Sequence, residues 1–292
     1  MSGIAARRRV AWAFAALLGS CFVAPVFFAT AAEPTAADPD RIRASIREAL
    51  AAAEGGAGSR PPEPIGVRGE IGPKGEPTRA SRLVVRESGV YENYLIDGGW
   101  KEQRLVRISA DAVVLRNCEI RNGLNNAVEV YGDDVLIENC RIHHVLRGTF
   151  AKQADAHGVT GRPRRLVVRN CEIYQVSGDA LQFDPGRDAW GDVLIENCEL
   201  WTGPLTEDAA GFRRGERPGE NAVDTKTDPK NPPARLVIRN CFLHGWGDGQ
   251  ISVQAALNLK ERLNALVENC AFRDNDVCFR LRGDTGRGNA DV

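Results

Sequence analysis

The chain has 292 residues, of which 43% are hydrophobic and 26% charged, and its formal net charge is −1. These values are ordinary for a globular protein that buries a sizeable core. A net charge this close to zero excludes binding of a highly charged partner by overall electrostatic attraction, so we expect no nucleic-acid partner.

The N-terminus carries a basic, then an apolar, then a small-residue segment. Three arginines at residues 7–9 precede an apolar run that ends at ATAAE, residues 29–33. This order is typical of a cleaved export signal. We predict that residues 1–32 are a signal peptide, that the protein is secreted or periplasmic, and that it has no membrane contact beyond the signal. An uncleaved anchor and a lipoprotein site at Cys21 are the alternatives.

One phrase recurs six times farther along the chain: VVLRNCEI, VLIENCRI, LVVRNCEI, VLIENCEL, LVIRNCFL and ALVENCAF, between residues 113 and 272. Its apolar residues alternate, as in a strand, and every copy has an asparagine before a cysteine. Asparagine tolerates the left-handed backbone of a sharp turn, and stacked asparagines can bond to one another. We predict reduced cysteines stacked in the turn, with Cys278 on an outward face.

A second apolar strand follows each copy, and successive cysteines are as few as 22 residues apart. This length holds three short strands and no crossover helix, so the chain must coil as a solenoid. The asparagine turns and the short repeat resemble the right-handed parallel β-helix proteins of the pectate-lyase-like superfamily. The resemblance implies an all-β, single-stranded right-handed parallel β-helix of about seven coils over residues 81–292. We expect a single domain and a monomer.

Residues 33–80 precede this domain. The stretch DPDRIRASIREALAAAEGG predicts a short helix that begins near Asp38 or Asp40, and we expect it to cover the first coil. The segment GVRGEIGPKGEP has four glycines at period three, too few for a collagen helix. We interpret it as a linker.

Candidate site residues come from aligning the second strands on Val128, Val159, Leu181, Val223, Ile251 and Val277. The alignment produces two outward columns: Glu129, Thr160, Gln182, Asp224, Ser252 and Cys278, and Tyr131, Arg162, Asp184, Lys226, Gln254 and Arg280. It predicts that Lys226 lies one coil from Asp184 and two coils, roughly 10 Å, from Arg280.

The resemblance implies a chemistry for this groove. Lyases of the superfamily remove the proton beside a uronate carboxylate with a lysine or arginine, while calcium or arginine neutralises that carboxylate. Lys226 would be the base and Arg280 the carboxylate partner. Calcium, which prefers oxygen ligands, would be held by Asp179, Asp184, Glu220 and Asp224. We therefore expect an anionic polysaccharide as substrate and β-elimination as the reaction.

Alternatives remain for the same residues. Lys226 could simply pair with Asp184 and Asp224, which would spoil it as a base. The two aspartates could instead serve inverting glycoside hydrolysis, for which their separation of roughly 8 Å is suitable. The non-enzymatic alternative is an envelope protein that only binds glycans with this face.

Further residues are candidates for substrate binding. Arg162 and Gln254 stand in the column of Lys226, and His157 precedes that face as an acid, a sugar ligand or a structural turn residue. Trp190 and Trp201 belong to insertions that could hang over the groove, or could pack the insertions onto the solenoid.

Overall fold

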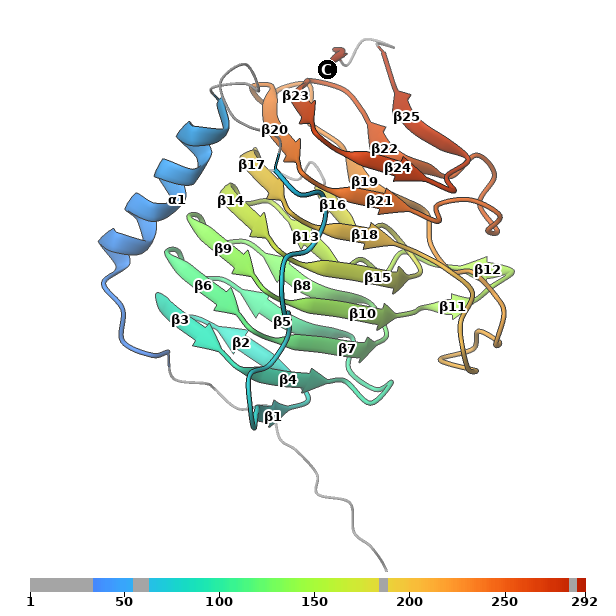
Figure 1. The fold of residues 1–292 in the computed structure, drawn as a ribbon, viewed down its shortest axis with the longest axis horizontal. Helices are drawn as coiled ribbons and strands as arrows, with labels where there is room; N and C mark the ends of the chain where they lie inside the picture. The colour runs from blue at the N-terminus through green and yellow to red at the C-terminus, as the bar shows by residue number, and fades with distance from the viewer. Residues whose placement is uncertain (1–33, 55–62, 184–188, 284–287) are drawn as a thin grey trace, which may run out of the picture.

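The computed structural model describes residues 34–54, 63–183, 189–283 and 288–292. They form a solenoid of three parallel sheets with eight strands each, so the described chain makes eight coils where the repeats predict about seven (Figure 1). The predicted signal peptide and Asp184 lie outside the described residues.

Each coil places one strand in each sheet. Sheet A consists of β2 (Leu83–Val85), β5 (Arg104–Ile108), β8 (Asn126–Val130), β13 (Val159–Gly161), β16 (Leu181–Phe183), β19 (Asn221–Thr225), β22 (Ala255–Leu259) and β25 (Val277–Leu281). Sheet B consists of β3 (Gly89–Glu92), β6 (Val113–Arg116), β9 (Val135–Glu138), β14 (Arg164–Arg169), β17 (Gly191–Glu196), β20 (Ala234–Arg239), β23 (Leu263–Glu268) and β26 (Ala290–Asp291).

Sheet C completes the coil after the asparagine turn. It consists of β1 (Thr78–Ala80), β4 (Tyr94–Asp97), β7 (Glu119–Gly123), β10 (Arg141–Val145), β15 (Glu172–Val176), β18 (Glu199–Trp201), β21 (Phe242–His244) and β24 (Ala271–Arg273). A short hairpin, β11 (Gly148–Thr149) and β12 (Lys152–Gln153), projects from one edge. Because β1 already pairs with β4, the solenoid begins at Thr78.

The asparagine turn forms as predicted. The asparagines of all six copies have left-handed φ values, for example 54° at Asn139 and 51° at Asn170. Their amides bond along the solenoid axis: Asn170 Nδ2 donates to Asn139 Oδ1 at 2.8 Å and Asn269 Nδ2 donates to Asn240 Oδ1 at 2.7 Å. Side-chain hydrogen bonds therefore link the turns of successive coils.

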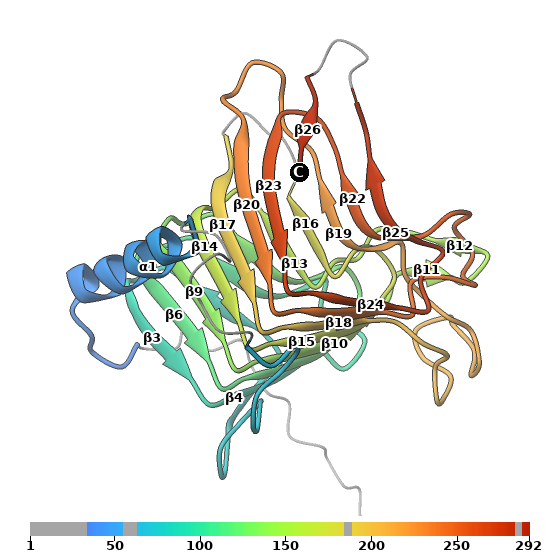
Figure 2. The ribbon, with the colours of Figure 1, turned by 45° about the horizontal axis from the view of Figure 1, so that its top comes forward.

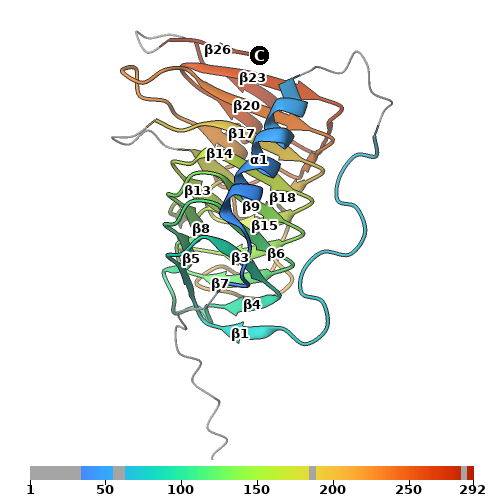
Figure 3. The same ribbon diagram turned by 90° about the vertical axis from the view of Figure 1, so that its left-hand side faces the viewer.

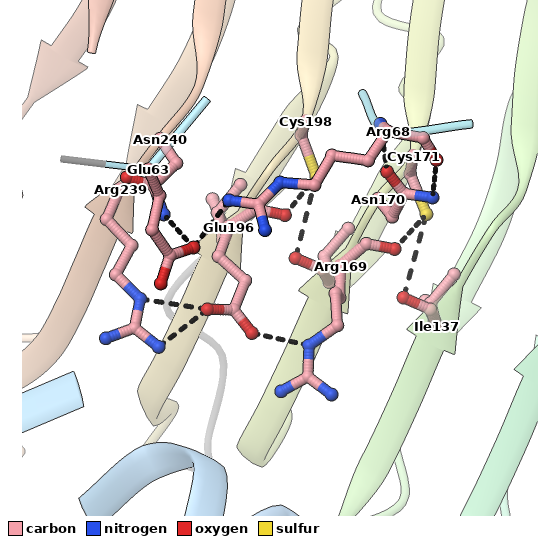
Figure 4. Close-up of polar contacts among 12 residues, drawn as sticks. Glu63, Arg68, Ile137, Arg169, Asn170, Cys171, Glu196, Cys198, Arg239 and Asn240 are labelled. Carbon is pink, nitrogen blue, oxygen red and sulfur yellow. Dashed lines mark hydrogen bonds and ion pairs between the residues drawn. The ribbon is translucent and has the colours of Figure 1, made fainter. Parts of the chain in front are cut away.

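The six repeated cysteines stand beside this ladder as a column of free thiols, as predicted. Cys140 and Cys171 are fully buried, and each Sγ donates to the carbonyl two residues earlier. Figure 4 shows Cys171 in this column. Burial raises the pKa of both thiols, which keeps them protonated. Cys140 and Cys171 fill space in the core.

The outer face of sheet B carries an alternating ion ladder. Consecutive strands align Glu92, Arg116, Glu138, Arg169, Glu196, Arg239 and Glu268. Glu196 accepts from Arg169 on one side and from Arg239 on the other (Figure 4). Alternating signs in one column let each charge face its opposite on both neighbouring coils.

Helix α1 (Pro39–Glu54) lies against the side of the solenoid and does not cover the first coil, so that prediction is wrong. Figure 3 shows it crossing the strands of sheet B. Its apolar stripe of Ile42, Ile46, Leu50 and Ala53 packs on Val114, Leu136, Val167, Leu194 and Val237. These outward-facing apolar residues recur once per coil, so the helix covers several coils.

The predicted linker is a docked strap. Residues 63–77 run back along the asparagine turns toward β1 (Figures 1 and 3). Gly66 N donates to Asn240 O and Gly72 N donates to Asn139 O, each at 2.8 Å. The period-three glycines all have positive φ, a conformation that favours glycine. No helix in the described part of the chain is long and apolar enough to cross a membrane.

Candidate functional site

Strand pairing in sheet A corrects the predicted register. β19 pairs with β22 and β22 with β25 (Figure 2). This register aligns Gln182, Asp224, Asn258 and Arg280. The predicted strand around Ile251 is wrong, because residues 249–254 belong to a loop in which Val253 has a φ of 60°. Arg280 is therefore in the column of Asp224, two coils away, and Lys260 takes the place expected for Gln254.

Two lysines from neighbouring coils meet on one carboxylate. Lys260 Nζ lies 2.7 Å from Asp224 Oδ1 and 2.9 Å from Oδ2. Lys226 Nζ lies 3.7 Å from Asp224 Oδ2. The Asp224 side chain is 3% exposed, that of Lys260 12% and that of Lys226 37%. Lys226 is thus the member of this group that solvent and a ligand can reach.

Two carboxyl groups next to this group have raised pKa values. Asp179 is fully buried, and burial together with the charges of Asp224 and Glu220 raises its pKa well above the usual range. Burial, Asp155 and Asp224 raise the pKa of Glu220, which Lys260 and Lys226 partly offset. These carboxyl groups hold their protons to higher pH than ordinary acids.

A sequence model of the family described as "Right handed beta helix region" matches residues 105–203. The match spans β5 to the end of β18, within the three stacked sheets. The described chain therefore has the right-handed parallel β-helix fold. The scaffold fits those of pectate-lyase-like proteins and glycosidases, but a scaffold by itself assigns no reaction. A search of curated proteins found no match to the chain.

His157 belongs to a polar ladder at the start of sheet A in this β-helix. Its backbone N donates to Asn126 Oδ1 at 3.3 Å, and its Nδ1 accepts from the backbone N of Asp179 at 3.0 Å. Asn221 continues the ladder by donating to Asp179 Oδ1 at 2.8 Å. His157 is 5% exposed, which favours the structural alternative over a sugar ligand.

The two predicted tryptophans do not hang over the Lys226 face. Trp190 is 2% exposed, stacks on Phe183 and donates from Nε1 to the backbone O of Lys226 at 2.7 Å. It thereby supports the strand end that carries the lysine. Trp201 lies in sheet C, stacked between Tyr174 and His244, on a different face of the β-helix.

Gln254 and the long insertion are likewise structural. Gln254 is fully buried, and its side chain bonds to the backbone of Gly219 and Gly249. The insertion after β18 places Phe212 in a small apolar cluster with Leu146 and Leu205, as the packing alternative predicted.

The described carboxylates do not fit a calcium site. Asp179 accepts from the Asn221 amide at 2.8 Å and from the Gln182 amide at 3.1 Å, while the Lys260 ammonium contacts both oxygens of Asp224. Calcium needs charged or carbonyl oxygens that face it without competing donors. The described residues contain no group of three or more Asp, Glu, His or Cys side chains that could hold a metal ion.

Sequence reasoning missed Lys260 and Asn258. Both follow the stretch 249–254, and an alternating pattern in that stretch hid the real strand. The segment AALNLK, residues 255–260, has alanine in its second position, as the strand starts NAV and DAL do, and then alternates apolar and polar residues. This pattern indicates the strand that carries Asn258 and precedes Lys260. Arg162 directly follows β13, and its guanidinium carbon lies 5.7 Å from the centre of the partly exposed Tyr131 ring at the outer face of sheet A.

Proposed function

We propose that the protein is an exported enzyme that cleaves a uronate-containing polysaccharide by β-elimination on the outer face of sheet A. The observation that carries the proposal is the meeting of Lys226 and Lys260 on Asp224, with Arg280 two coils farther in the same column. A base and fixed cations are the groups that this reaction needs.

Lys226 is the base in this proposal, because it is the exposed amine of the pair. As the free amine it takes the proton from the carbon beside the uronate carboxylate. The C–H electrons form the new double bond, and the glycosidic C–O bond breaks. Arg280 neutralises the uronate carboxylate, which favours loss of that proton. Lys260 makes the close contacts to both oxygens of Asp224, which leaves Lys226, 3.7 Å from the same carboxylate, as the more weakly held amine. Asp224 fixes the Lys260 ammonium by two contacts.

The leaving oxygen needs a proton, and Glu220 is suited to supply it. Its raised pKa keeps a carboxylic acid available at a pH where ordinary glutamates are ionised. Glu220 also interacts electrostatically with both lysines, which supports its assignment as the acid.

Glycoside hydrolysis is the second candidate, because Glu220 and Asp179 have raised pKa values while Asp224 is paired with ammonium groups. A protonated acid beside an ionised carboxylate is the arrangement that hydrolysis uses. The two reactions differ in product, since only elimination creates a conjugated double bond.

The test is incubation of the purified protein with pectate, alginate and glycosaminoglycans, with and without a chelator. Ultraviolet absorbance follows the unsaturated product, and a reducing-end assay follows all cleavage. We expect both signals to rise together on one substrate. Reducing ends without absorbance would replace elimination by hydrolysis, and neither signal on any substrate would leave glycan binding as the function of this face.

A further inference from the structure

Tyr131 stands between two arginine side chains on the outer face of sheet A. The guanidinium carbon of Arg107 lies 4.6 Å from the centre of the Tyr131 ring, and that of Arg162 lies 5.7 Å from it. Arg107 is on the preceding coil and Arg162 on the following one. Tyr131 is 38% exposed, so the ring and its two cations are accessible to a ligand.

More cations surround this group. A surface depression of about 220 Å³ is lined by Arg82, Lys101, Glu102, Gln103, Arg104 and Arg107. The side chains of Arg104 and Arg107 are 52% and 44% exposed. The cations outnumber the acids here, although the chain as a whole is close to neutral.

One buried carboxylate organises the arginines without neutralising them. Glu129, whose side chain is 2% exposed, accepts from Arg104 Nε at 2.7 Å, while Arg107 Nη1 lies 3.6 Å from its other oxygen. That oxygen, Oε2, has no hydrogen-bond donor among the described residues. A single carboxylate balances one of these positive charges, so an excess of positive charge faces solvent.

The same sheet face connects this group to the lysines. The strand register aligns Arg107, Glu129, Thr160, Gln182 and Asp224 on successive coils. Four coil steps separate Arg107 from Asp224, about 19 Å, and three steps separate Tyr131 from Lys226, about 14 Å. An extended polymer along the β-helix axis can contact both places at once.

We propose that Arg107, Tyr131 and Arg162 form a distal subsite that binds the carboxylates of an acidic polysaccharide several sugar units from the Lys226 group. The identity of the polymer rests on the proposed function. Guanidinium groups bind carboxylates through paired charge-assisted hydrogen bonds, and the tyrosine edge adds an apolar surface and a hydroxyl. Because two sites on one chain bind in concert, the subsite raises affinity for long chains and leaves short ones unaffected.

The experiment measures Kd of the full chain for pectate by calorimetry. The double variant Arg107→Gln/Arg162→Gln is compared with Arg79→Gln, an exposed arginine in sheet C. A second pair of measurements uses Lys226→Gln as the background, so that turnover does not consume the ligand. Fully methyl-esterified pectin has the same backbone without the charge, and a galacturonate disaccharide is too short to span both places.

We expect the double variant to raise Kd for pectate at least tenfold, Arg79→Gln to leave it within twofold, and the esterified polymer to bind weakly to every form. The disaccharide should show equal affinity for the parent and the double variant. An unchanged melting temperature establishes that the double variant is folded.

The outcomes separate this inference from the proposed function. If the parent binds pectate without cleaving any substrate and the double variant loses that affinity, the subsite is supported and the lyase proposal is refuted. If the parent cleaves pectate and the double variant has the same affinity and KM for pectate, the subsite is refuted and the lyase proposal stands. A parent that does not bind pectate overturns the subsite as well.

Discussion

Lys260 Nζ lies 2.7 Å from Asp224 Oδ1, although 36 positions separate the two residues in the chain. Coil stacking creates the pair, because β22 follows β19 in sheet A. Lys226, two residues after Asp224, reaches the same carboxylate from its own coil. One carboxylate therefore holds a buried and an exposed amine, and the two should respond differently to substitution.

Replacing the exposed amine should remove the chemistry alone. Lys226→Gln is expected to lower kcat on pectate by on the order of 10²- to 10⁴-fold, the usual contribution of a general base, with little change in melting temperature. Initial rates of unsaturated product give the measurement. Lys230→Gln, in an exposed turn, is the matched control and should keep full activity. A Lys226→Gln enzyme with more than a tenth of the parent kcat would contradict the base assignment.

Replacing the buried amine should affect stability as well. Lys260→Gln removes the ammonium that contacts both oxygens of a carboxylate with a 3% exposed side chain, so it should cost on the order of 3 kcal/mol in unfolding free energy. Urea titration measures this loss. Lys260→Arg keeps the charge and should recover most of the stability. Equal stability of Lys260→Gln and the parent would show that the ion pair of Lys260 with Asp224 does not form in solution.

The raised pKa of Asp179 predicts a pH dependence of stability. Since the folded protein binds this proton more tightly than the unfolded chain, the contribution is complete below about pH 4, the ordinary value for aspartate. It is lost as the pH rises toward the folded pKa. Asp179→Asn removes the titration, so its unfolding free energy minus that of the parent should increase from about pH 4 upward and then level off.

Melting temperatures of the parent and Asp179→Asn across the pH range give that difference. Asp248→Asn, at an exposed position, controls for the loss of a charge. A difference that shrinks as the pH rises has the opposite sign and would refute burial as the cause.

The fold could be predicted from the sequence because every coil repeats the same local signals. The asparagine before the cysteine takes a left-handed φ in all six copies, and the flanking aliphatic residues line the core. The strap was missed because its contacts are long-range: Arg68 meets Asn170 across 102 residues, and no local pattern encodes such a partner.

The candidate site was predicted only in part, for a physical reason. The register along sheet A depends on where each insertion ends. The apolar alternation at residues 249–254 resembles that of the real strand, β22, which follows it directly. That shift misplaced Arg280 and hid Lys260. Asp224 and Lys226 were found because Asp224 lies on β19 and Lys226 directly follows the end of that strand, where no insertion intervenes.

The ion ladder on sheet B should be stable at its centre and weak at its end. Glu196 is 5% exposed and accepts from both Arg169 and Arg239, whereas the Glu92 side chain is 34% exposed and bonds to Arg116. Glu196→Gln should cost about 3 kcal/mol, because it leaves two arginines without a shared partner. Glu92→Gln should cost about 0.5 kcal/mol, as for exposed pairs. Equal costs in urea titration would mean that burial does not strengthen the ladder.

The strap should depend on Asn170 more than on its neighbour in the turn ladder. Asn170 Oδ1 accepts from Arg68 N at 2.6 Å, and its Nδ2 donates to Arg68 O at 3.0 Å (Figure 4). Asn197 has a similar φ, but its Oδ1 has no hydrogen-bond partner among the described residues. Asn170→Gly and Asn197→Gly both keep the left-handed backbone, so only the side-chain bonds differ between the two variants.

We expect Asn170→Gly to cost about 2 kcal/mol, from three partly buried hydrogen bonds, and Asn197→Gly to cost clearly less. Limited trypsin digestion should cut the Asn170→Gly protein faster after Arg68 and Lys74, because the strap leaves the turns more often while the coils stay folded. The Asn197→Gly protein should be cut at the parent rate. Equal digestion of the two variants would show that the strap is held by its other contacts, such as the bonds of Gly66 and Gly72 to the turn carbonyls, and that Asn170 adds nothing to them.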